Sequence, residues 1–166
     1  MIETIISKDI EFLNNAVNNR EKYFAHSQDF TRNRTLDYRK IAGMLINLPR
    51  KTLAVEIQDF LEQLDLEQVK YTKSAFSHAR LKLNPCFFQD WYTIQNEAFY
   101  EEKTYQTWEG FRLMGLDGSR GYLTNTPALA AAFGTQDNQH SSYPMYQFLI
   151  GQDLLNNLCL FSDIAP

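Results

Sequence analysis

The hydrophobic pattern of this 166-residue chain changes its period once, near Trp108. Up to about Tyr100 the apolar residues recur at helical spacing, and after Trp108 they form short apolar runs that are typical of strands. A chain with this order is expected to have an α+β fold, in which a helical bundle precedes an antiparallel sheet. We expect the boundary near residues 103–108, with one domain over residues 1–103 and a second over residues 108–166.

Five helices are expected before the boundary, over about residues 7–23, 36–47, 52–64, 72–83 and 85–100. Thr72 is a good N-cap for the fourth helix, and Asn84 followed by Pro85 opens the fifth. The fourth helix is short and basic and follows a turn, so this half of the chain suits a helix-turn-helix module. The helical pattern alone fits any other small bundle as well.

Three strands are expected after the boundary, in the runs "FRLMGL", "MYQFLIGQDLL" and "LCLFSDI". They should form a three-stranded antiparallel meander over residues 111–163, with Asp117 near the C-terminal end of the first strand. A two-residue turn is expected at Asn156-Asn157, because asparagine tolerates the left-handed conformation. Apolar residues occupy both faces of this sheet, so each face needs a covering layer.

Two further segments lie between the first two strands. The run "PALAAAF" is expected to be a brief helix that Thr126 caps and Gly134 closes. The run "TQDNQHSSYP" that follows is expected to be a polar loop.

Composition describes a chain that can bury a core, because 44% of its residues are hydrophobic and 22% are charged. No apolar run approaches the length of a membrane span, and the start "MIETIISKDIEF" lacks the pattern of a signal peptide. We therefore expect a cytoplasmic protein with no membrane partner. Cys86 and Cys159 have no CxxC or CxxxH neighbour, which favours two buried thiols over a disulfide framework or a zinc site.

The net charge of −4 argues, by itself, against nucleic acid as a partner. However, residues 32–51 hold six bases against one acid, and residues 68–89 hold four bases and no acid. A local basic surface is what a phosphate backbone requires, although two solvated helix faces explain the charge pattern equally well. The candidate DNA-contacting residues are Arg39, Lys40, Lys70, Lys73, Ser77, His78, Arg80 and Lys82.

Asp117 follows the apolar run "LMGL" and precedes Gly118-Ser119. Asp-Gly and Gly-Ser are ordinary ways to leave a strand, so a turn explains this carboxylate without any function. Phosphatases of the haloacid-dehalogenase type offer an enzymatic alternative, because they carry a nucleophilic aspartate two residues before a second aspartate. Here that position is Gly115, which has no side chain to attack phosphorus, so the alternative fails.

The segments "TKSAFSHAR", "LDGSR" and "NTPALAAAFGTQ", in this order and spacing and followed by a long apolar hairpin, carry a resemblance. The chain from about residue 37 to residue 166 resembles the N-terminal portion of bacterial insertion-sequence DDE transposases of the insertion-sequence-four class, also called transposase family eleven. The resemblance implies a helical DNA-binding part, an RNase H-like catalytic part, double-stranded DNA at inverted-repeat ends as the partner, and a homodimer as one assembly. It also implies that Asp117 is the first metal-binding aspartate and that Mg²⁺ is the cofactor.

The sequence departs from this family in its carboxylates. The family uses three, and its second aspartate and its glutamate lie well beyond the hairpin, after the point at which this sequence ends. Asp153 and Asp163 lie on the second and third expected strands, so we interpret both as structural or surface residues. A lone Asp117 cannot fix two ions, and the chain as written is expected not to be a working transposase. A stand-alone DNA-binding module and an inert gene remnant are the alternatives.

Overall fold

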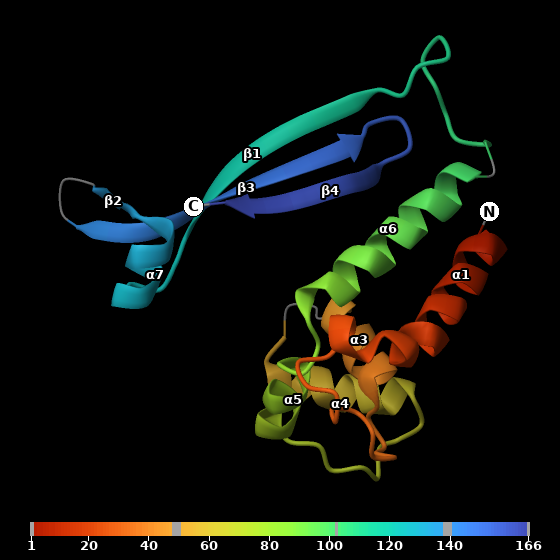
Figure 1. Ribbon diagram of the computed structural model, residues 1–166, viewed down its shortest axis with the longest axis vertical. Coiled ribbons are helices and arrows are strands. Elements are labelled where there is room, and N and C mark those ends of the chain that lie inside the picture. The colour runs from red at the N-terminus through yellow and green to blue at the C-terminus, as the bar shows by residue number, and fades with distance from the viewer. Residues whose placement is uncertain (1, 48–50, 102, 138–140, 166) are drawn as a thin grey trace. The chain divides into compact units, whose positions relative to one another are not determined.

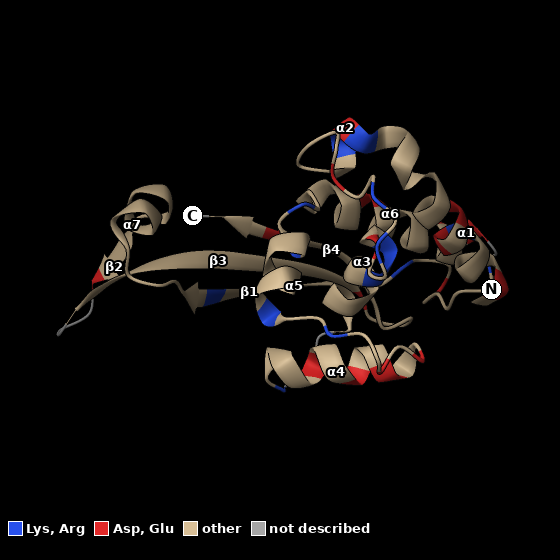
Figure 2. Cartoon of the chain, turned by 90° about the horizontal axis from the view of Figure 1, so that it is seen from below, with Lys and Arg blue, Asp and Glu red and all other residues tan. Residues whose placement is uncertain are grey.

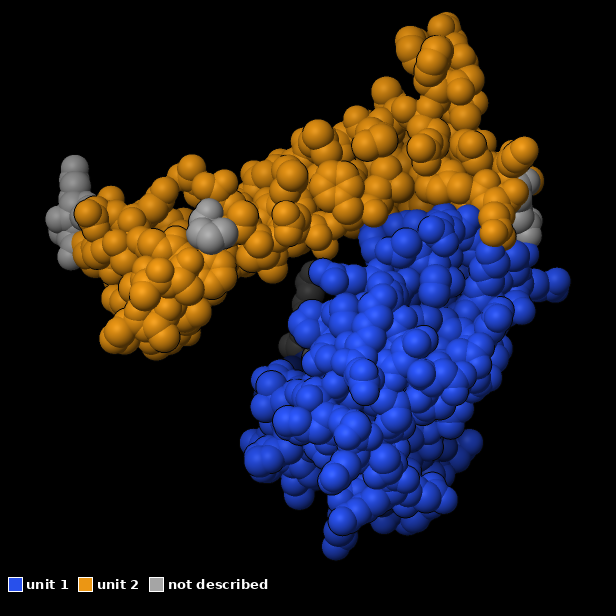
Figure 3. Space-filling view, viewed as in Figure 1, with its two compact units in different colours: residues 1–98 blue, residues 99–166 orange. Residues whose placement is uncertain are grey.

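The computed structural model describes residues 2–47, 51–101, 103–137 and 141–165 (Figure 1). The chain divides between Ala98 and Phe99 into two compact units, which we call unit 1 (residues 1–98) and unit 2 (residues 99–166) (Figure 3). The expected mixed α+β class is confirmed, because α-helices precede an antiparallel sheet along the described residues. No helix in these residues is long and apolar enough to cross a membrane.

The helices before the sheet follow the expected order, with bounds α1 Ile2–Asn15, α2 Arg20–Tyr23, α3 Tyr38–Ile46, α4 Leu53–Gln63, α5 Lys73–Arg80 and α6 Pro85–Glu101. The division between the two units falls within α6, after Ala98. The first expected helix is wrong in its extent, because α1 stops at Asn15 and a 3-10 turn over Ala16–Asn19 precedes α2. Four of the residues from 14 to 19 are asparagines, whose side chains compete with the helical backbone for hydrogen bonds.

Threonine caps fix the starts of two helices as the sequence predicts. Thr72, before α5, and Thr126, before α7 (Pro127–Phe133), each accept a hydrogen bond from the backbone amide three residues further on. Gly134 follows α7 with a φ of +71°, a conformation that L side chains rarely adopt. Local capping chemistry therefore sets both helices.

The core of unit 1 is built around the ring of Phe87 on α6, which is completely buried. Phe12 of α1, Tyr23 of α2 and Tyr38 of α3 place their ring centroids 5.2–6.3 Å from it. Trp91, one turn further along α6, lies 5.9 Å from the same ring. One aromatic cluster thus ties four helices together.

The sheet of unit 2 has β3 (Ser142–Asp153) as its central strand. The strands β1 (Met114–Tyr122), β2 (Thr135–Asp137) and β4 (Leu158–Ala165) each pair with β3 in antiparallel register. The long strands β3 and β4 largely coincide with their predicted runs, whereas β1 begins three residues after the start of its predicted run and continues beyond its end. The short strand β2 is an addition, because residues expected to form a polar loop pair instead with the start of β3.

The strand β1 does not end at Asp117, which corrects the expected position of this residue. The ladder between β1 and β3 is continuous to Tyr122, so Asp117 lies in the middle of the strand. A Cβ atom at Gly121 would lie 2.4 Å from the ring of Tyr146, so the glycine makes room for this aromatic ring. The small residues that indicate a turn in the sequence are accommodated within the strand by this packing.

The connection between β3 and β4 spans residues 154–157, so the expected two-residue turn is wrong. Asp153 accepts hydrogen bonds from the backbone amides of Leu155 (3.2 Å) and Asn156 (3.1 Å), which holds the longer turn closed. Asn157 has a φ of +50°, so an asparagine does take the left-handed conformation here.

Both faces of this sheet carry exposed apolar side chains. Leu116 and Phe161 lie on one face, and Ile164 lies on the other. The aromatic cluster described above belongs to unit 1, so the sheet buries much less apolar surface than the helices do.

Candidate nucleic-acid interface and the surroundings of Asp117

The helix α5 is held in unit 1 by its apolar side. Phe76 and Ala79 are buried, and Leu83 just after the helix is buried as well. These residues pack α5 against α3 and α4. Because the buried residues occupy only one side of the helix, the opposite side faces solvent.

The solvent-facing side of α5 carries small polar groups and one ring. Ser74 and His78 are exposed, and Ser77 is half-buried between them. Ser77 and His78 lie three and four positions after Ser74, so all three residues share one face of the helix. Hydroxyl and imidazole groups at this spacing can donate and accept hydrogen bonds toward a ligand that lies along the helix.

The predicted DNA-contacting bases fall into two groups. Arg39 is bound to Asp37 at 2.8 Å, the Lys40 ammonium donates to the Thr35 carbonyl, and Lys82 pairs with Asp29 at 3.0 Å. These three side chains stabilise unit 1 itself. The side chains of the others, which are Lys70, Lys73, His78 and Arg80, form no ion pair or hydrogen bond within the described part of the chain.

The structure adds a base that was part of the charge pattern but was not among the candidate contacts. Burial raises the pKa of the Tyr71 phenol, and the nearby Arg34 guanidinium counteracts part of this effect. Arg34 therefore acts electrostatically on a residue of the loop that leads into α5. The link is not visible in the sequence, because the two residues belong to separate basic stretches.

The neighbouring helix α4 has the opposite charge, as Figure 2 shows by its acidic bands. Asp59 pairs with Lys51, and Glu62 accepts a hydrogen bond from Gln58. The connection from α4 to α5 spans residues 64–72, which is longer than the three- or four-residue turn of a helix-turn-helix motif. The acidic residues of α4 make this helix a less favourable surface than α5 for an anionic partner.

Asp117 is exposed, and the pleat of the sheet isolates it from the other carboxylates. Directly opposite residues share a face in an antiparallel sheet. Asp117 shares its row with Ile150 and Ser162, whereas Asp163 lies in the next row, opposite Leu149. The side chains of Asp117 and Asp163 therefore project from opposite faces.

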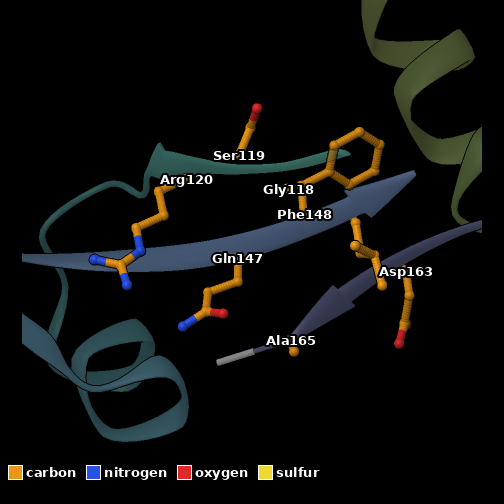
Figure 4. A pocket seen from close by; sticks show the side chains of 8 residues that line it. Gly118, Ser119, Arg120, Gln147, Phe148, Asp163 and Ala165 are labelled. Atoms are coloured by element: carbon orange, nitrogen blue, oxygen red, sulfur yellow. The ribbon is translucent and has the colours of Figure 1, made fainter. Parts of the chain in front are cut away.

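An open hollow of about 410 Å³ lies on the Asp163 face of the sheet. Arg120 and Gln147 also line it, and Figure 4 shows Ser119 pointing to the other side. The alternation along β1 places Ser119 on the same face as Asp117. Asp117 is consequently outside this hollow.

Asp153 is completely buried in unit 2. Its hydrogen bonds give it the structural role that is expected for this residue from the sequence. Its carboxylate accepts hydrogen bonds from the Tyr100 hydroxyl (2.7 Å) and from the Asn156 side-chain amide (2.9 Å). Burial acts to raise the pKa of Asp153, but these bonds outweigh it and leave the pKa below its ordinary value. Burial and the bond to Asp153 raise the pKa of Tyr100 to about 12.

The residues around Asp117 do not fit a two-ion Mg²⁺ site. Magnesium sites of this kind need several oxygen ligands, and no group of three His, Cys, Asp or Glu residues lies together among the residues that the structure describes. Cys86 and Cys159 are free thiols, half-buried where full burial was expected. We therefore derive no catalytic step through a metal.

Replacing Asp117 by asparagine is expected to leave Mg²⁺ binding unchanged in calorimetric titrations, because its neighbours across the described ladder are Ile150 and Ser162 and not a second carboxylate. The unaltered chain is expected neither to nick nor to join supercoiled plasmid DNA with Mg²⁺ or Mn²⁺. Cleavage that disappears in Asp117→Asn would contradict this prediction.

Comparison with protein-family models, with curated proteins and with solved structures finds no match to this chain.

Proposed function

We propose that unit 1 binds double-stranded DNA through the exposed face of α5. The observation that carries the proposal is a set of bases in and just before α5 that form no ion pair or hydrogen bond within the described residues, which are Lys70, Lys73 and Arg80. No acidic residue occurs from 68 to 89 to oppose them. Such bases neutralise phosphates and release condensed counterions.

A duplex fits this surface because a single exposed helix can enter the major groove. The small side chains of Ser74 and Ser77 let the helix backbone come close to the bases, and Lys73 and Arg80 lie beside them to reach the phosphates. The internally paired Arg39, Lys40 and Lys82 are not part of this proposed contact.

We propose further that the DNA is an element end and that the chain is a portion of a DDE transposase. The ordered segments "TKSAFSHAR", "LDGSR" and "NTPALAAAFGTQ" support this proposal. Three long antiparallel strands with a carboxylate on the first of them are compatible with the start of an RNase H-like sheet. The lack of a fitting metal site around Asp117 restricts the proposal for this chain to binding.

The test is a titration of a fluorescent 30-base-pair duplex with the full chain at several salt concentrations. Binding should weaken steeply with salt, and Lys73→Ala and Arg80→Ala should each reduce the slope of log K against log salt by about one unit. Lys51→Ala is the matched control, because it removes the same charge from a lysine that is paired with Asp59 on α4. Binding that is undetectable at low salt, or that salt does not affect, would exclude DNA as the partner.

A further inference from the structure

Leu81 has a larger exposed fraction, 73%, than the other large hydrophobic side chains of the described residues. It follows directly after α5, as the C-cap residue, and keeps helical backbone angles of φ −68° and ψ −9°. The helical period therefore continues through Leu81. It lies seven positions after Ser74 and three after His78, so it shares their face.

The position of Leu81 indicates what this apolar group can contact. The side chains on and beside this face are hydroxyls, an imidazole and the bases Lys73 and Arg80, which form no ion pair within the described residues and do not make an apolar patch for another protein. Their charge is complementary to DNA, and the thymine C5-methyl group is the apolar feature of base edges in the major groove. A branched aliphatic side chain is suited to that methyl group.

We infer that Leu81 contacts thymine methyl groups, so that the DNA read by α5 includes A·T pairs at the end of the helix where Leu81 lies. This inference rests on the proposed DNA-binding function. At a rise of about 1.5 Å per residue, Ser74 and Leu81 are about 10 Å apart along the helix. With the helix lying along the groove, the thymine should be about three base pairs from the base nearest Ser74.

The experiment compares thymine with deoxyuridine, which pairs identically and lacks only the C5-methyl group. Duplexes that the full chain binds are first selected from a random pool, and each thymine of a selected site is then replaced in turn. One replacement should weaken binding by about fourfold, the effect of one lost methyl contact. Leu81→Ala should weaken binding to the thymine duplex and bind both duplexes equally.

Val55→Ala is the matched control, because it shortens another exposed aliphatic side chain, on α4. This variant should retain the difference between thymine and deoxyuridine. Circular dichroism should show that both variants keep their helices.

The possible outcomes distinguish a failure of this inference alone from a failure of the proposed DNA binding. Failure to bind duplex DNA at low salt would overturn both. Salt-dependent binding without any effect of deoxyuridine would overturn the inference alone. A thymine preference that persists in Leu81→Ala would also overturn it, because another residue would then be in contact with the methyl group.

Discussion

Replacing Phe87 by alanine is expected to lower the free energy of unfolding of unit 1 by about 3–5 kcal/mol. The ring is completely buried, and its removal leaves a cavity between α1, α2, α3 and α6 that these helices cannot close without moving. A typical domain is stable by about 5–15 kcal/mol, so much of the protein should lose its packed core at moderate urea concentrations.

The unfolding of unit 1 can be followed separately because each unit has one tryptophan. Trp91 lies in the aromatic cluster of unit 1, whereas Trp108 is exposed in unit 2. A Trp108→Phe background therefore leaves Trp91 fluorescence to report urea unfolding of unit 1. Leu81→Ala is the control, because it removes an exposed side chain and should change the free energy of unfolding by less than about 0.5 kcal/mol. A loss below about 1 kcal/mol in Phe87→Ala would show that the ring does not organise this core.

The same substitution should also weaken DNA binding, for a reason different from that of Lys73→Ala. The α5 face is presented by packing against α3, and α3 meets the aromatic cluster through Tyr38. Loss of this support should reduce the bound fraction without changing the salt slope, because no phosphate contact is removed.

The parts of the fold that the sequence predicts well are those that depend on neighbouring residues. The threonine caps before α5 and α7 and the proline that begins α6 act within a few residues, and all three helices begin where these signals lie. The change of period near Trp108 is equally local and gives the fold class.

The parts that the sequence does not predict depend on residues far along the chain. Asp117, Gly118 and Ser119 indicate a turn in the sequence, but pairing with β3 makes them part of a strand that continues to Tyr122. Lys82 resembles any basic candidate in the sequence, but Asp29, more than fifty positions earlier, holds it. The face from which Asp117 projects depends on the register of β1 with β3, which no local pattern specifies.

Replacing Asp153 by alanine is expected to destabilise unit 2 by at least about 3 kcal/mol. The carboxylate accepts hydrogen bonds from the Tyr100 hydroxyl, the Asn156 side chain and the backbone amides of Leu155 and Asn156. Each of these donors, if left buried without a partner, costs roughly 1–3 kcal/mol. Unit 2 buries little apolar surface, so this network contributes a large share of its stability.

The contribution of Asp153 should also depend on pH in a defined direction. Its pKa is lowered in the folded chain, so the unfolded chain binds the proton more tightly. The stabilisation is complete above the ordinary pKa of 3.8 and is lost as the pH falls through the lower pKa of the folded state. Asp153→Asn has no group that titrates at this position, and its stability should therefore fall less steeply in acid than that of the unaltered chain.

The measurement is thermal unfolding of the full chain between pH 2 and pH 7, followed by the fluorescence of Trp108 in unit 2 with Trp91 replaced by phenylalanine. Both chains share every other acid, so the difference between their two curves isolates Asp153. Tyr100→Phe is the companion variant, because it removes one donor, keeps the carboxylate, and should bring the acid-dependent loss closer to neutral pH by raising the pKa of Asp153. Identical pH curves for the unaltered chain and Asp153→Asn would show that the buried carboxylate does not hold the β3–β4 turn through its charge.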